Sequence, residues 1–113
     1  MITIFHNPKC KKSREGLAFI TSLNIEFCIR NYFEQPFSVI ELKELFKYFN
    51  EPIITLIRTQ EDDYKKLYKG KDLNDEEWIT VLVNSPKLLQ RPLVFNNAKL
   101  ILAQPVEKIL SII

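Results

Sequence analysis

The sequence is poor in the residues that bind metals or build disulfide scaffolds. It contains two cysteines, Cys10 and Cys28, and a single histidine, His6. Two cysteines are too few for a disulfide-rich domain, and these three residues do not have the spacing of a zinc motif. We therefore expect two free thiols and no metal site.

An excess of charge and a long apolar run are also missing. Sixteen Lys and Arg against fourteen Asp and Glu leave a formal net charge of +2, which does not indicate a nucleic-acid or membrane surface. No apolar run approaches the roughly 20 residues that span a bilayer, and the N-terminus lacks the features of a signal peptide. These absences predict a cytoplasmic protein with neither a nucleic-acid nor a membrane partner, and the near-neutral charge favours a monomer.

What remains is the composition of a globular protein. The chain has 113 residues, of which 46% are hydrophobic and 27% charged, values that exclude disorder and fibrous structure. This length predicts one domain with a sufficient core.

The order of predicted elements indicates an α/β protein. A strand over residues 2–5, a helix from about Lys11 to Leu23 and a strand over residues 25–30 form a βαβ unit, whose strands should be parallel. Helices are expected after Ser38 and Pro52 and from Asn74, and a helical turn is expected over residues 62–67. Strands 93–95 and 99–102, joined by an Asn96-Asn97 turn, and a helix after Pro105 complete the chain. Together they predict a mixed four-stranded sheet.

Cys10 is the strongest candidate for chemistry. It lies between the first strand and the first helix, at the edge where open α/β sheets place their sites. A helix N-terminus and nearby cations lower the pKa of a thiol, and the thiolate is the reactive form. The sequence supplies the cations, namely Lys9, Lys11, Lys12 and Arg14, and His6 lies four residues upstream.

The second cysteine of a CxxC motif is replaced by Ser13, so Cys10 is a monothiol that another thiol must resolve. Cys28, in the second strand, is expected to be a small buried hydrophobic residue rather than that resolving thiol. Arg58 and Arg91 stand at the ends of predicted elements. They are either solvated or structural charges, or a pair that binds an oxyanion through two guanidinium forks.

The run from Ile4 to Arg14, which contains His-Asn-Pro-Lys-Cys-Lys-Lys-Ser-Arg, resembles the start of the glutaredoxin-dependent arsenate reductase family. This thioredoxin-fold group also contains the Spx-type transcription regulators and the YffB thiol reductases. Later blocks, including Leu56-Ile57-Arg58 and the stretch from Asn84 to Val94, are similar to the family as well. The resemblance implies one thioredoxin-like domain over residues 1–113, with a helical insertion at about residues 36–90.

The resemblance also implies a mechanism. The cysteine matching Cys10 attacks arsenate, glutathione adds to the adduct, and glutaredoxin carries the reduction to arsenite. The residue matching His6 helps to hold the cysteine as thiolate, and the arginines matching Arg58 and Arg91 bind the oxyanion. Ser13, Lys11, Lys12 and Arg14 lie in the same motif, and no bound cofactor is expected beyond glutathione as co-substrate. A proline at the place of Pro92 is commonly cis in thioredoxin-like folds and faces the cysteine, although its residue type alone favours trans.

One position departs from the family. Gln104 stands before Pro105, where the arsenate reductases have a third anion-binding arginine. The loss of one charge-assisted hydrogen bond of about 1.5–3 kcal/mol would weaken oxyanion binding. Two alternatives therefore stand beside arsenate reduction: a glutathione-dependent thiol or disulfide reductase, and an Spx-type protein that binds RNA polymerase.

Overall fold

The computed structural model describes all residues from Met1 to Ile113. The chain divides into two compact units. The first consists of residues 1–36 and 91–113, and the second of residues 37–90. The first unit contains the whole β-sheet, and the second contains only helices and loops.

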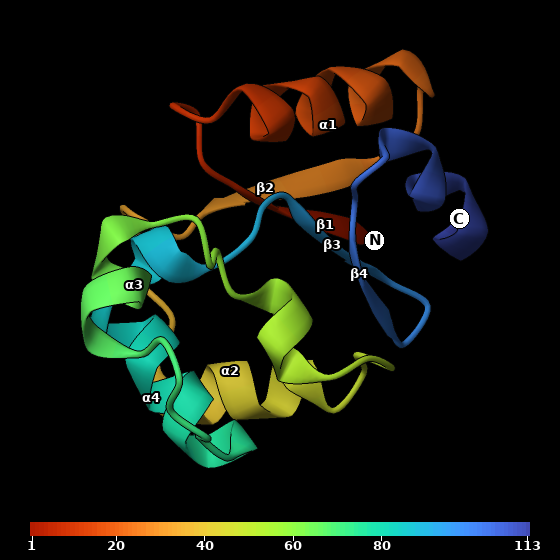
Figure 1. The fold of residues 1–113 in the computed structure, drawn as a ribbon. Helices are drawn as coiled ribbons and strands as arrows, with labels where there is room; N and C mark the ends of the chain where they lie inside the picture. The colour runs from red at the N-terminus through yellow and green to blue at the C-terminus, as the bar shows by residue number, and fades with distance from the viewer. The chain divides into compact units, whose positions relative to one another are not determined.

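The sheet of the first unit has four strands in the order β2-β1-β3-β4 (Figure 1). These are β1 (Ile2–His6), β2 (Phe27–Asn31), β3 (Leu93–Asn96) and β4 (Lys99–Leu102). β1 runs parallel to β2 and antiparallel to β3, and β3 runs antiparallel to β4. This confirms the predicted mixed sheet and the thioredoxin-like class, in which a β-α-β half joins a β-β-α half.

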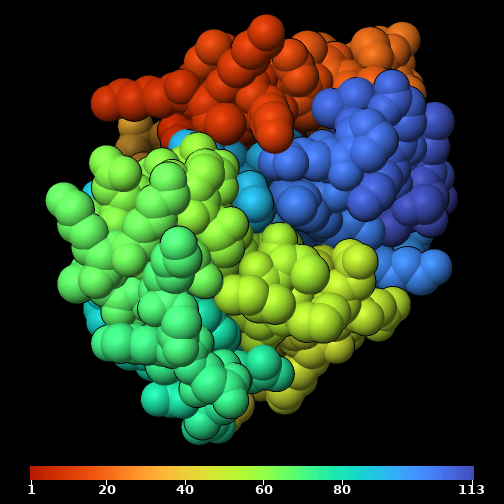
Figure 2. Space-filling view, viewed as in Figure 1, coloured from red at the N-terminus to blue at the C-terminus, as the bar shows by residue number.

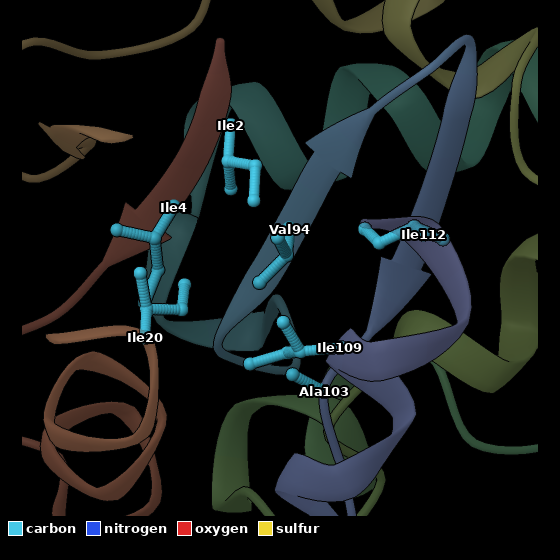
Figure 3. Packing of buried hydrophobic residues seen from close by; sticks show 7 residues of the cluster. All are labelled: Ile2, Ile4, Ile20, Val94, Ala103, Ile109 and Ile112. Atoms are coloured by element: carbon cyan, nitrogen blue, oxygen red, sulfur yellow. The ribbon is translucent and has the colours of Figure 1, made fainter. Parts of the chain in front are cut away.

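One face of this sheet is covered by helix α1 (Lys11–Ser22) and by the C-terminal 3₁₀ helix η3 (Val106–Ile112). Figure 3 shows the cluster that joins them, to which the sheet, α1 and η3 all contribute: Ile2, Ile4, Ile20, Val94, Ala103, Ile109 and Ile112. In Figure 2 the surfaces of α1 and of the C-terminal segment lie side by side. The core fixes α1 against β1, so the loop between them has a defined place.

The second unit is built from short helices: α2 (Val39–Phe46), η1 (Ile53–Leu56), α3 (Asp62–Leu67), α4 (Asp75–Asn84) and η2 (Pro86–Leu88). Side-chain caps begin two of the predicted helices. The side chain of Ser38 accepts a hydrogen bond from the Glu41 N–H, and Asn74 forms a full capping box with Glu77. Trp78 of α4 is buried, whereas α3 has no buried residue.

Three sequence predictions need correction. β2 covers residues 27–31 rather than 25–30. The hairpin turn is Asn97-Ala98, both with positive φ, because Asn96 pairs with Lys99 in the ladder. Cys28 is exposed rather than buried, because β2 is an edge strand.

No helix in the structure is both long and apolar enough to cross a membrane.

Candidate active site

Cys10 is the residue that begins helix α1. It is the N-cap, with extended backbone angles (φ −98°, ψ 126°), and its carbonyl accepts the Arg14 N–H at 3.0 Å. The Cys10 N–H in turn donates to the Asn7 carbonyl at 3.0 Å, which closes the loop after β1. The thiol is half-buried and stands beside the N–H groups of the first helical turn, because Cys10 is the residue from which α1 begins.

The surroundings of Cys10 favour its ionised form. Partial burial raises the pKa of the thiol, but hydrogen bonding and charge from Arg91, with the backbone N–H groups of Ser13 and Lys12, outweigh it. The pKa of Cys10 is therefore lowered from the ordinary value. The acting cation is Arg91, far along the chain, rather than the lysine side chains next to Cys10 in sequence. The resulting thiolate is a nucleophile at lower pH than an ordinary cysteine.

Ser13, His6 and Asn7 form a buried polar network that joins the end of β1 to the first turn of α1. Ser13 is fully buried, and its Oγ lies 2.7 Å from Nδ1 of His6 and accepts the Asn7 N–H at 2.9 Å. Burial lowers the pKa of His6, a hydrogen bond with the Ser13 backbone opposes this effect, and the charge of Arg14 adds to it. His6 is thus held neutral at physiological pH, and the Ser13 hydroxyl can donate its proton to Nδ1.

Arg91, Pro92 and Gln104 form the other wall of the site. The Arg91-Pro92 bond is cis, as the family resemblance implies and against the trans preference of the residue type alone. The Gln104 Nε2 donates to the Arg91 carbonyl at 2.6 Å, and the Lys12 Nζ lies 3.5 Å from the Gln104 Oε1. Lys12, Arg91 and Gln104 are far apart in the sequence, and the structure brings them together within the first unit.

Gly16 is a site residue that our sequence analysis missed. A Cβ atom at Gly16 would lie 2.6 Å from Cγ of the buried Pro92. Only glycine lets α1 approach the proline this closely. The sequence did contain a signal, namely a glycine inside a predicted helix. Such a glycine lowers helix stability by about 1 kcal/mol relative to alanine, and it is often present because close packing requires it.

The remaining cations of the motif have other surroundings. Arg14 is exposed, and its Nη1 donates to the Pro8 carbonyl at 3.0 Å, which stabilises the loop before Cys10. Lys11 is exposed in the first turn of α1. These surroundings do not test anion binding, so the anion-binding roles of Lys11, Lys12 and Arg14 stay predictions.

Arg58 belongs to the second unit. There its backbone N–H donates to the Leu88 carbonyl at 2.7 Å, and its Nη1 lies 3.4 Å both from the Lys87 carbonyl and from Oε1 of Glu61. Arg58 is therefore held within its unit by backbone and side-chain contacts. Its convergence on Cys10 stays a prediction.

Taken together, the first unit presents a thiol with a lowered pKa, a guanidinium against it and the N-terminus of a helix. This combination can attack an electrophilic centre that carries negatively charged oxygens, because the guanidinium and the N–H groups stabilise the anion. No cluster of His, Cys, Asp and Glu could hold a metal ion.

Comparisons with known proteins show which family this chain resembles. The chain is 32% identical to "Arsenate reductase" of Haemophilus influenzae over 114 residues, covering 99% of this chain and 98% of that protein. The structure of "Arsenate reductase from Vibrio cholerae" superposes with a TM-score of 0.91 at 35% identity, covering 99% of this chain and 97% of that one. "Global transcriptional regulator Spx" of Staphylococcus aureus is 28% identical over 101 residues, covering 88% of this chain and 77% of that protein. The ArsC family model matches residues 5–112, and the chain belongs to the ArsC family.

Proposed function

We propose that this protein reduces arsenate to arsenite, with Cys10 as nucleophile and glutathione, through glutaredoxin, as the source of electrons. The observation that carries the proposal is the half-buried Cys10 thiol at the N-terminus of α1, whose pKa is lowered by hydrogen bonding and charge from Arg91. Relatives named arsenate reductase, matched over almost the whole chain, support the choice of oxyanion.

The proposed reaction begins when the Cys10 thiolate forms a bond to arsenic and one arsenate oxygen leaves as water. A glutathione thiol then joins its sulfur to that of Cys10, while arsenic(V) takes up two electrons and leaves as arsenite. A second glutathione, through glutaredoxin, reduces this mixed disulfide, which restores Cys10 and yields glutathione disulfide. Arsenate and two thiols thus give arsenite, one disulfide and water.

In this proposal Arg91 binds both the thiolate and the oxyanion, and Arg58 supplies a second guanidinium. Bidentate guanidinium contacts are well suited to an arsenate ion. Neutral His6 and Ser13 hold the loop that carries Cys10, since the Ser13 hydroxyl bonds both His6 and the Asn7 N–H at the start of that loop. The reaction takes place on a monomeric, cytoplasmic protein that needs no bound cofactor.

The test is arsenate-dependent oxidation of NADPH, coupled through glutathione reductase, glutathione and glutaredoxin. We expect turnover with the wild type and none with Cys10→Ser. The matched control is Cys28→Ser, which removes the other, exposed thiol and should keep full turnover. Arsenate-dependent turnover that survives in Cys10→Ser would contradict the proposal.

A second candidate is a glutathione-dependent thiol or disulfide reductase without arsenate activity. The observation that favours it is Gln104, whose amide is engaged with Arg91 and carries no charge for an anion. Cys10-dependent reduction of a glutathione mixed disulfide, with no response to arsenate, would select this candidate.

The third alternative, an Spx-type regulator, draws support from the Staphylococcus aureus relative. The buried Ser13 argues against a redox switch of the CxxC kind, because its hydroxyl cannot form a disulfide with Cys10. Recovery of a polymerase subunit with the purified protein would favour this alternative.

A further inference from the structure

Gln104 connects two parts of the active site through the two ends of one amide. Its Nε2 donates to the Arg91 carbonyl at 2.6 Å, and its Oε1 lies 3.5 Å from the Lys12 Nζ. The opposite orientation of the amide would place two oxygens face to face and an NH₂ group against an ammonium. The chemistry of its neighbours therefore fixes which way the amide points.

The backbone next to Arg91 is held from two sides. On one side, the Ala103 N–H donates to the Pro92 carbonyl at 3.0 Å, beside the bond from Gln104 to the Arg91 carbonyl. On the other side, Pro92 packs against Gly16 of α1. The Gln104 bond is the side-chain member of this clamp, and it acts on the residue whose guanidinium reaches Cys10.

We propose that Gln104 is a positioning residue that holds Arg91 against the Cys10 thiol by hydrogen-bonding the Arg91 carbonyl. Lys12 assists by fixing the orientation of the Gln104 amide. The inference rests on the proposed function only for the use made of the thiolate, since the contacts themselves involve no arsenate.

The test measures ionisation of Cys10 in a Cys28→Ser background, where Cys10 is the only thiol. Thiolate absorbance and the rate of alkylation by iodoacetamide are followed as functions of pH. Gln104→Met keeps the length of the side chain but removes both hydrogen-bonding atoms. We expect it to raise the pKa of Cys10 and to slow alkylation near neutral pH about 3- to 10-fold, because the thiolate is the reacting form.

Two further variants sharpen the test. Gln104→Glu has the same shape but places a carboxylate oxygen against the Arg91 carbonyl, so we expect a larger slowing than with methionine. The matched control is Gln60→Met, an exposed glutamine of the second unit, which should leave the titration of Cys10 unchanged. The other charged groups near Cys10, which are His6, Lys9, Lys11 and Arg14, are the same in all of these proteins.

Lys12→Met keeps the test decisive if Gln104→Met does not fold. Lys12 is exposed, and its loss should slow alkylation about twofold, because Lys12 fixes the orientation of the amide that bonds the Arg91 carbonyl. A purely structural role for Gln104 would lower the unfolding temperature and leave the titration of Cys10 unmoved. That result, or a titration that Arg91→Met does not shift, would overturn the inference, whereas absence of arsenate turnover alone would overturn only the proposed function.

Discussion

The Oγ atom of Ser13 lies 2.7 Å from Nδ1 of His6, and both side chains are buried. Ser13 also accepts the backbone N–H of Asn7, so one hydroxyl satisfies two polar groups at the end of β1. Ser13 stands at the position where a CxxC protein has its second thiol. The serine thus has a structural role in the loop that carries the nucleophile.

Ser13→Ala should destabilise the protein by about 1–3 kcal/mol, because it leaves buried polar groups on His6 and Asn7 without this partner. Chemical denaturation followed by circular dichroism measures the loss. The control is Ser111→Ala, an exposed serine whose Oγ bonds only the local Lys108 carbonyl, and it should change stability by less than about 0.5 kcal/mol. Equal effects of the two substitutions would contradict the role of Ser13.

Gly16→Ala should destabilise the protein even though alanine favours a helix by about 1 kcal/mol. The added Cβ would lie 2.6 Å from the buried Pro92, and overpacking of this kind costs about 1–3 kcal/mol. Because Pro92 follows Arg91, we also expect slower alkylation of Cys10. The measurements are the unfolding temperature and the alkylation rate.

Gly70→Ala separates these two effects. Gly70 has a φ of +82° and open space around its Cα, so alanine there strains only the backbone. It should lower the unfolding temperature without changing the reactivity of Cys10. If Gly70→Ala slows alkylation as much as Gly16→Ala does, the packing argument for Pro92 is wrong.

Arg91→Met should raise the pKa of Cys10 toward the ordinary thiol value, because partial burial then acts with less opposition. In the wild type the thiolate fraction rises as the pH increases through the lowered pKa, so alkylation reaches its plateau at lower pH than in the variant. Alkylation rates across the titration, in a Cys28→Ser background, measure the displacement. Coincident curves for the two proteins would show that Arg91 does not act on the thiol.

His6 should make stability depend on pH. Burial, which is the largest cause, lowers its pKa from the ordinary 6.5, so the folded state binds the proton less readily than the unfolded state. Its contribution is complete above the unfolded pKa and is lost as the pH falls through the folded value. The free energy of unfolding should therefore decrease below about pH 6.5 more steeply in the wild type than in His6→Asn. Parallel curves would contradict this assignment.

Local sequence patterns predicted most of the elements but were less exact at their ends. The spacing of Leu17, Ile20 and their neighbours predicts α1, because a helix repeats its buried face every three to four residues. The observed hairpin turn, Asn97-Ala98, lies one residue after the predicted Asn96-Asn97 turn. The prediction missed it because alanine is not a residue type that indicates a positive φ. The prediction that Cys28 is buried is wrong because the exposure of a strand residue depends on the order of the strands. An alternating sequence pattern does not reveal that β2 lies at the edge of the sheet.

By itself, the sequence determined the βαβ start, the place of Cys10 before a helix, the family motif around it and the departure at Gln104. Each of these is encoded within a few neighbouring residues, through periodicity, capping and residue type. Only the tertiary structure decided which groups act on the thiol. Arg91 and Gln104 reach the site because β3 pairs with β1 and the chain after β4 returns beside it, and such long-range contacts depend on how the core packs.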